Sequence, residues 1–356
     1  MKVALIALGL LALTVAGFIF VGGSAPYITV PPDHLWDVGG YTITNTVMSA
    51  WVTIILLVVV AAIAGPRMGL VPSGFSGAVE AALSAFYDFC ISVAGEQNAR
   101  RFLPLVGTIF FYILLSNWIA LLPGFKTVGL PIPDYGPTQS VVQQVDVPLL
   151  GSFAYVPFTP EQVDVEGGEP LRLPAVTAES MHLEEPYIET TDGSFTGNIR
   201  GILRPVHSDI TAPLAIALFS FVFVEFWGIQ SLGLGYLKKF FAFDAIARKG
   251  VLGGIDIFVG ILELASELSR IISFTFRLFG NIFAGSVLML MMPFLTPFVL
   301  VLPFYGLELF VGAIQAFVFA VLTLVFAMSA ISHHGDDHPE GGAESAGGHA
   351  EPVSAH

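Results

Sequence analysis

The sequence of 356 residues has few charged side chains and almost no cysteine. Asp, Glu, Lys and Arg together make up 12% of the chain, while hydrophobic residues make up 54%. The single cysteine, Cys90, excludes an intrachain disulfide. Basic residues are scarcer than acidic ones, 14 against 28, and the net charge of −14 argues against nucleic acid as a partner.

Because charge is so sparse, long stretches of the chain are apolar, and the mean hydropathy is +0.78. Several of these runs reach the roughly 18 to 20 residues that a helix needs to cross a bilayer. They are continuous rather than alternating, which indicates helices and not the strands of a membrane barrel. We therefore predict an all-α polytopic membrane protein with about six membrane helices.

The apolar runs divide the chain into the segments 1–40, 41–123, 124–209, 210–332 and 333–356. The first segment holds an apolar run after Lys2, followed by a short outer stretch. The length of that run favours an uncleaved signal anchor over a cleaved signal peptide. The second segment contains spans at about 41–64 and 102–123, and the fourth begins with a span at about 210–234.

Residues 75–95, between the spans of the second segment, indicate a different kind of helix. Apolar side chains recur there at spacings of four and three, while polar side chains fall on the opposite side. The recurring apolar residues are Val79, Leu83, Phe86, Cys90 and Val93. An amphipathic helix of this kind lies either in the membrane interface or against other protein, and both interpretations are open.

Residues 124–209 are polar, rich in Pro and Gly, and strongly acidic. The basic residues that oppose its many Asp and Glu side chains are Lys126, Arg172, Arg200 and Arg204. We predict an irregular acidic extracytoplasmic insertion, in which stretches such as SFAYVPF suggest a few strands.

Clusters of Lys and Arg predict the orientation of the chain. They gather in 65–101 and in the loop 236–250, so we expect both to be cytoplasmic and the acidic insertion to lie outside. The polar tail 333–356 is then cytoplasmic and disordered. Its histidines are a candidate metal-binding group, but a solvated tail is the preferred interpretation, and we expect no metal and no cofactor.

The run from Val251 to Met292 is too long for an ordinary membrane helix. It has no proline and would be roughly 60 Å long, twice the roughly 30 Å of the hydrocarbon core. Ordinary tilts do not absorb this excess, so the helix either breaks, for instance at Gly280, or lies unusually obliquely. Together with the run 297–332 it forms a long helical hairpin that turns outside.

One stripe of this long helix is polar and consists of Glu263, Glu267, Arg270, Arg277 and Asn281. At about 100° per residue these positions fall within roughly an 80° arc. Charges at membrane depth are costly and mark ion pathways or functional pairs. Internal salt bridging explains the two glutamates and Arg270 equally well, because helical spacing lets them meet. It does not explain Arg277, which has no acidic residue one turn away on its own helix.

The last helix supplies companions for this polar stripe. Glu308 and Gln315 are seven residues apart and share a face. Counting outward from the turn of the hairpin places Gln315 at about the depth of Arg277. Ser286 and Glu308 lie nearer the outside, whereas the two glutamates of the stripe lie nearer the cytoplasm. Polar groups thus occupy an outer half and an inner half, with Arg277 between them.

These residues closely resemble the last two helices of subunit a of F-type ATP synthases. The resemblance rests on FRLFGNIFAG, at 276–285, and on LELFVGAIQAFVFAVLTLVF, at 307–326. The span FLPLVGTIFFYILLSNWIALLPG is similar to that family as well. The resemblance covers roughly 40–123 and 209–332, and RLFGN together with QAFVF is highly specific. It implies nothing about the N-terminal helix or the acidic insertion.

Carried over by position, Arg277 matches the family's essential arginine, which faces a rotating ring of c subunits. Asn281 and Gln315 match polar residues beside it. Ser286 and Glu308 match two positions of the outer half-channel. Many relatives carry an acid at the first of these two positions and a histidine or another polar group at the second. Here the carboxylate stands at the second position only.

The resemblance implies a stator subunit that offers two proton half-channels to the carboxylates of the c-ring. Protons then enter from outside past Glu308, Ser286 and Asn281 and leave past Glu263 and Glu267, while rotation of the ring is coupled to ATP synthesis. The chain itself performs no bond chemistry. Implied partners are the c-ring, the b subunits of the peripheral stalk, other ATP synthase subunits and membrane lipid. The implied location is the bacterial plasma (inner) membrane.

A self-contained secondary ion or anion transporter, with Arg277 binding an anionic substrate, is the main alternative. It predicts an internal repeat with matched broken helices, and the sequence shows none. A scaffold protein, in which the charges merely pair, is a third interpretation. That interpretation predicts tolerance of conservative changes in the stripe.

Overall fold

The computed structural model describes the membrane part of the chain almost completely and the acidic insertion in pieces. Described are residues 9, 12, 15, 30–67, 74–122, 128–132, 138–147, 151–155, 162–164, 188–189, 195–196, 198–233, 236, 253–295 and 301–332. Most of the predicted signal anchor, the basic loop after Tyr236 and the histidine-containing tail lie outside these residues.

Five described helices are long and apolar enough to cross a membrane. They are α2 (Asn45–Ala64), α3 (Gly74–Ile119), α5 (Thr211–Leu232), α7 (Gly253–Leu295) and α8 (Val301–Ser332). The prediction of a helical, multi-pass membrane protein is therefore confirmed. The sixth, N-terminal helix stays a prediction.

Helix α2 has the dimensions of a simple membrane span. Its 20 residues correspond to about 30 Å, the thickness of the hydrocarbon core, so its axis is a natural estimate of the membrane normal. The predicted start of this span at residue 41 is wrong, because Tyr41–Thr44 forms strand β2, paired with β1 (His34–Val38). The β-branched residues of YTIT favour a strand, and the Thr44 hydroxyl then caps the helix by accepting from the amide of Val47.

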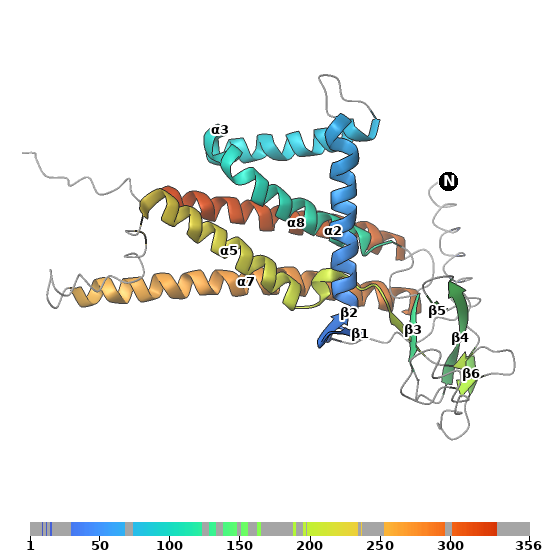
Figure 1. Ribbon diagram of the computed structural model, residues 1–356. Coiled ribbons are helices and arrows are strands. Elements are labelled where there is room, and N and C mark those ends of the chain that lie inside the picture. Colours follow the sequence, from blue (N-terminus) through green and yellow to red (C-terminus); the bar gives the residue numbers. More distant parts are fainter. Residues whose placement is uncertain are drawn as a thin grey trace, which may run out of the picture.

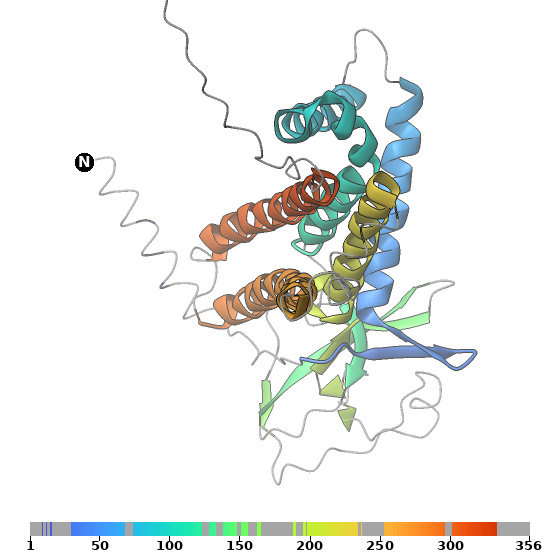
Figure 2. The same cartoon turned by 90° about the vertical axis from the view of Figure 1, so that its left-hand side faces the viewer.

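Helices α7 and α8 both run at a large angle to α2 (Figures 1 and 2). Helix α7 has 43 residues, which corresponds to about 65 Å, and it continues through Gly280 without a break. Of the two arrangements that the sequence left open, the structure has the oblique one. Helices α5 and α8 both pack against α7, and α8 also packs against α3.

Helix α3 joins the predicted amphipathic helix and the span that follows it. It bends at Gly95, whose φ of 74° lies outside the helical region, and it ends at Ile119 rather than near residue 123. The first half, which runs at a large angle to α2 (Figure 1), packs on the second half through the stacked rings of Phe86 and Phe110. The predicted apolar face is buried at Phe86 and Cys90, whereas Val93 is 38% exposed.

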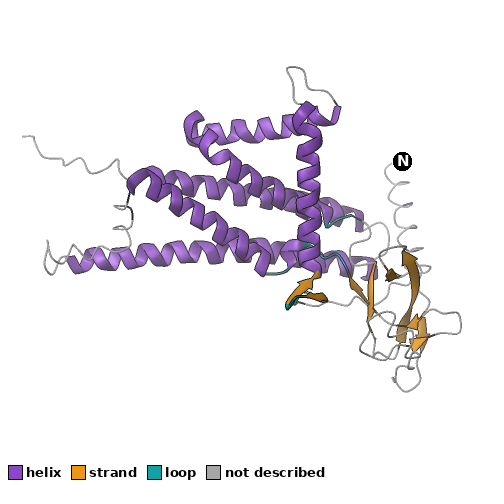
Figure 3. Cartoon of the chain, viewed as in Figure 1, coloured by secondary structure: helices purple, strands orange, loops and turns teal. Residues whose placement is uncertain are grey.

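Strands gather beside one end of the helical bundle (Figure 3). Within the insertion they pair antiparallel in the order β7-β8-β4-β5-β3-β9, and β6 pairs with β4. Their bounds are Val128–Ile132 (β3), Thr138–Val147 (β4), Gly151–Tyr155 (β5), Gln162–Asp164 (β6), Ile188–Glu189 (β7), Phe195–Thr196 (β8) and Asn198–Gly201 (β9). The prediction of an irregular insertion is thus wrong for these segments, although SFAY does form a strand.

The connection between strand β9 and helix α5 contains a buried cation, Arg204. This side chain is only 4% exposed. Its guanidinium donates to the carbonyls of Pro31 and Val30, at 2.8 and 3.2 Å, and to the hydroxyl of Ser208 at 2.9 Å. Burial lowers the pKa of Arg204, and the carboxylates of Asp33 and Asp209 act in the opposite direction.

The neighbours of Arg204 join the start of α2 to the start of α5. Asp209 accepts from the hydroxyls of Thr46 and Thr211, at 3.2 and 2.7 Å. His207, in the short helix η2 (Val206–Ser208), is fully buried and lies 2.8 Å from the hydroxyl of Ser116 on α3. Burial lowers the pKa of His207 to about 3, so its imidazole is uncharged at neutral pH.

We expect Arg204→Met to destabilise the fold strongly, because the change leaves the carboxylates of Asp33 and Asp209 without the cation near which both lie. Breaking a buried charge cluster of this kind costs about 3 kcal/mol in the free energy of unfolding. Thermal unfolding of the protein in detergent measures this change as a lower midpoint.

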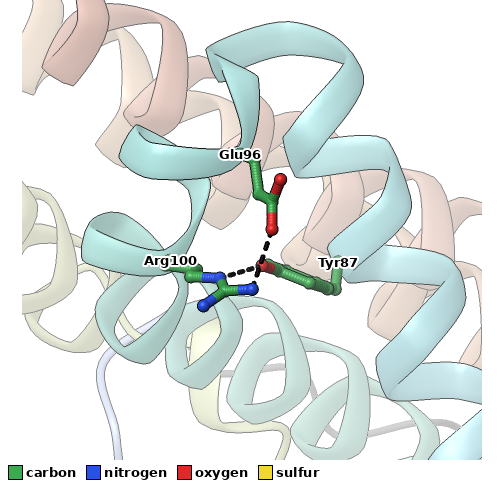
Figure 4. A network of polar contacts seen from close by, with 3 residues as sticks. All are labelled: Tyr87, Glu96 and Arg100. Carbon is green, nitrogen blue, oxygen red and sulfur yellow. Dashed lines mark hydrogen bonds and ion pairs between the residues drawn. The ribbon is translucent and has the colours of Figure 1, made fainter.

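The matched control is Arg100→Met on the surface of α3. The Arg100 guanidinium donates to Glu96 at 2.8 Å and to the hydroxyl of Tyr87 at 3.2 Å (Figure 4). Both contacts are exposed to solvent. Solvent screens this exposed pair, so the control is expected to leave the midpoint unchanged. Equal midpoint shifts for the two variants would show that Arg204 is not a structural anchor.

Candidate functional site

The polar stripe of α7 lies along the border between its buried and its exposed face. Glu267 is 2% exposed, Glu263 and Arg270 are half-buried, and Arg277 and Asn281 are exposed. The buried face of the helix, Ile271, Phe274, Leu278 and Ile282, packs in a core with α3, α5 and α8. All five predicted residues therefore share one side of a single unbroken helix, as the sequence predicts.

Arg277 is exposed near the middle of α7. Within the described part of the chain its guanidinium has neither a hydrogen-bond acceptor nor an ion-pair partner. Its surroundings are apolar or open: Phe276 is exposed, and a Cβ atom added at Gly280 would have no atom within 4 Å. An unpaired cation at membrane depth is unfavourable, so this geometry favours an anion from beyond the described residues.

Two neutral amides meet beside Arg277. The Nδ2 atom of Asn281 donates to Oε1 of Gln315 on α8 at 2.8 Å. Gln315 is 4% exposed, and its own Nε2 is buried without an acceptor among the described residues. From α3, the Asn117 amide donates to the carbonyl of Gly312 at 3.2 Å. The predicted proximity of Asn281 and Gln315 is therefore present, and Asn117 fixes the same stretch of α8.

The group predicted to lie on the outer side consists of Glu308 and Ser286. The carboxylate of Glu308 crosses from α8 to the backbone of α7 and occupies the space in which a side chain at position 285 would stand. Gly285 is thus the residue that admits the carboxylate, directly beside Ser286. The Ser286 hydroxyl donates to the carbonyl of Phe283 on its own helix, at 2.8 Å.

The inner polar group is built on an ion pair. The Arg270 guanidinium lies 2.6 Å from Oε2 of Glu267, and its Cζ lies 3.5 Å from the centre of the Phe326 ring on α8. The salt bridge that the sequence allowed for Glu267 and Arg270 is present. Arg270 lies seven residues, about 10 Å, from Arg277, so the two guanidiniums occupy separate sites on α7.

Two residues of the inner group were not predicted from the sequence. The Tyr236 hydroxyl donates to the carboxylate of Glu225 on α5, and Glu267 and Arg270 lie close enough to affect Tyr236 electrostatically. Glu225 is the single charged residue between 211 and 232. A lone charge in an apolar span indicates a functional residue, so the sequence did contain a sign of its role. Tyr236 carries no such signal, because its placement depends on how the chain folds back after α5.

Comparison with known proteins identifies relatives over most of the chain. The family model described as ATP synthase A chain matches residues 46–157 and 193–328. Among similar proteins, ATP synthase subunit a of Gloeobacter violaceus is 27% identical over 311 residues, which cover 86% of this chain and 92% of that protein. ATP synthase subunit a of Aliarcobacter butzleri is 24% identical over 309 residues, covering 85% and 96%.

The contact between Glu308 and Gly285 predicts a local steric effect. In Gly285→Ala the added methyl group enters the space of the carboxylate, and overpacking of this kind costs about 1 to 3 kcal/mol. Thermal unfolding in detergent is expected to show a lower midpoint. The matched control is Gly306→Ala on α8, where an added Cβ meets nothing within 4 Å and alanine has the higher helix propensity. A midpoint that rises in both variants would show that the Glu308 carboxylate does not occupy the space beside Gly285.

Proposed function

Because the chain belongs to the ATP synthase A chain family, we propose that it is the stator subunit a of an F-type ATP synthase. In this role it passes protons between the two sides of the membrane and the carboxylates of a rotating ring of c subunits. Each proton that crosses about 100 mV releases roughly 2.3 kcal/mol, and rotation transmits this energy to the catalytic head. The chain itself forms and breaks no covalent bond other than those to protons.

The exposed guanidinium of Arg277, with no partner in the described part of the chain, is the observation that supports this proposal most strongly. A carboxylate carried by another subunit must be protonated while it faces lipid, since a bare charge there is prohibitive. Beside Arg277 the opposite charge favours its ionised form, so the proton leaves. Arginine suits this position because it stays protonated even where it is poorly hydrated.

The three polar groups on α7 and α8 supply the two half-channels of the proposal. Protons enter from outside past Glu308 and Ser286 and reach the ring near Asn281 and Gln315. They leave past Glu263 and Glu267 after the ring has turned. Arg277 stands between the two groups and bars a direct passage, because a second positive charge is repelled there.

The same geometry supports the partners and orientation of the proposal. The exposed side of α7 around Arg277, which includes Phe276 and Gly280, offers a surface to the c-ring. The b subunits and other ATP synthase subunits bind elsewhere on the chain. The sheet lies outside and the segment 65–101, which ends in Arg100 and Arg101, lies in the cytoplasm, as does the C-terminus, in a bacterial inner membrane. A secondary transporter with paired broken helices is disfavoured, since α7 is continuous.

We expect Arg277→Ala to abolish ATP-driven proton pumping by the whole complex in inverted membrane vesicles, because the ring carboxylate then loses the charge that releases its proton. Arg277→Lys is expected to pump poorly as well, since a poorly hydrated lysine loses its proton more readily. Arg100→Ala, the exposed arginine of α3, serves as the control and should pump normally. Coupled pumping that survives in Arg277→Ala would refute the proposed function.

Glu308→Gln is expected to slow proton pumping without abolishing it. The substitution keeps the shape of the side chain beside Gly285 but removes the carboxylate that carries protons on the outer side, where they enter during synthesis and leave during ATP-driven pumping. The initial rate of ATP-driven acidification in the same vesicles measures the effect, with the surface substitution Glu96→Gln as the matched control. An unchanged rate in Glu308→Gln would remove Glu308 from the path.

A further inference from the structure

A buried polar cluster on the inner side of the bundle extends beyond the residues of the polar stripe. It consists of Glu225 on α5, Tyr236 after α5, and the ion pair of Glu267 and Arg270 on α7. We call these four residues the Tyr236 cluster. Tyr236 is 4% exposed and Glu267 is 2% exposed, and one carboxylate oxygen of Glu225 is buried. Glu225 and Arg270 are half-buried. Placing two carboxylates, a guanidinium and a phenol together out of water is costly, so their retention calls for an explanation.

The tyrosine is held in one position by a glycine of α5. A Cβ atom added at Gly228 would lie 2.7 Å from Cζ of Tyr236, so the ring packs directly on the helix backbone. Gly228 is three residues after Glu225, which places the two on neighbouring turns of the same helix face. The ring therefore directs its hydroxyl at the Glu225 carboxylate, to which it donates a hydrogen bond.

The electrostatics of the cluster keep the tyrosine protonated. Burial raises the pKa of Tyr236, the Glu225 and Glu267 carboxylates raise it further, and Arg270 lowers it. A phenol of this kind transfers a proton only by accepting one while it gives up its own. Its oxygen has acceptor capacity remaining while its hydrogen points at Glu225.

Glu225 also lies close to the surface that the basic residues mark as cytoplasmic. Arg101 donates to Gln230 and Ser231, at 2.7 and 3.3 Å. Those residues are five and six positions after Glu225 on α5, which corresponds to about 8 Å along the helix. Glu225 thus stands between the buried Glu267 and the inner surface.

We propose that Glu225 and Tyr236 extend the inner half-channel from Glu267 to the cytoplasmic surface, with Glu225 holding each proton last before its release. This inference rests on the proposed function of the chain. In the transfer, the O–H bond of protonated Glu267 breaks and its proton binds the Tyr236 oxygen. The original Tyr236 proton moves to the Glu225 carboxylate, so charge and atoms balance and nothing is oxidised.

Glu225→Gln separates a relay from a structural contact. The amide oxygen of glutamine still accepts the hydrogen bond from Tyr236, so a merely structural role is preserved, but the amide does not take up a proton. We expect ATP-driven pumping by the intact complex in inverted vesicles to fall about tenfold or more, a loss typical of a missing proton-transfer group. Glu225→Asp keeps a carboxylate and is expected to retain about half of the rate or more.

Two controls accompany this measurement. Glu96→Gln makes the same chemical change at an exposed carboxylate and should leave the rate unchanged. The amount of catalytic subunit bound to the membranes reports assembly of each variant. If Glu225→Gln does not assemble, Tyr236→Phe decides the matter, because it keeps the ring on Gly228 and removes only the hydroxyl. Loss of pumping in an assembled Tyr236→Phe complex supports the relay.

Normal pumping in an assembled Glu225→Gln complex overturns the inference. If Glu225→Gln does not assemble, normal pumping in Tyr236→Phe overturns it. A Glu225→Asp rate as low as that of Glu225→Gln overturns it as well. These results are distinguishable from failure of the proposed function, which Arg277→Ala tests. Loss of pumping in Arg277→Ala together with normal pumping in Glu225→Gln would leave the function in place and remove the inner extension alone.

Discussion

The mismatch between the length of α7 and the thickness of a bilayer is the constraint on which the rest of the structure depends. A helix of 43 residues is about 65 Å long, whereas the hydrocarbon core is about 30 Å thick. Since α7 does not break, it lies at a large angle to α2 (Figure 1), and α8 lies beside it at a similar inclination. An oblique helix presents its side rather than its end to a neighbouring subunit. The polar stripe is thereby spread along the side of the helix, so that Glu267, Arg277 and Asn281 stand at separate points on it.

Most of the membrane part was predictable because hydrophobic length and helical spacing are local properties of the sequence. The spacing of Glu263, Glu267, Arg270, Arg277 and Asn281 already places them on one side of a helix. Two errors at helix ends also have local causes: the β-branched stretch Tyr41–Thr44 forms a strand, and α3 ends before Pro123. What the sequence did not reveal depends on contacts between distant segments. Arg204 joins residues some 170 positions away, and Tyr236 reaches its partners only because the chain folds back onto α5. In the insertion, β3 pairs with β9 about 70 positions further along the chain.

Glycines place the polar groups of this chain as much as the polar residues themselves do. Gly285 leaves the space on α7 into which the Glu308 carboxylate enters from α8, and Gly228 leaves the space on α5 for the ring of Tyr236. In both places the missing side chain brings a polar group from one segment against the backbone of another. Gly280 is different, because nothing lies within 4 Å of a Cβ atom built there. Its openness belongs to the exposed face around Arg277, on which the proposed ring carboxylate arrives.

The neutrality of the groups beside Arg277 explains why its charge remains available. Had the chain placed an acid at Asn281 or Gln315, a permanent ion pair would form, and a passing carboxylate would have to compete with it at membrane depth. The two amides instead bond to each other and keep α7 and α8 in register without neutralising the guanidinium. The acidic residues of the described hairpin stand away from this point: Asp256, Glu263 and Glu267 lie ten or more residues before Arg277 on α7, and Glu308 lies beside Gly285. An arginine that acts on a partner's carboxylate requires this separation. Its attraction to that carboxylate must be strong enough to release the proton. The contact must also break again when the proposed ring turns.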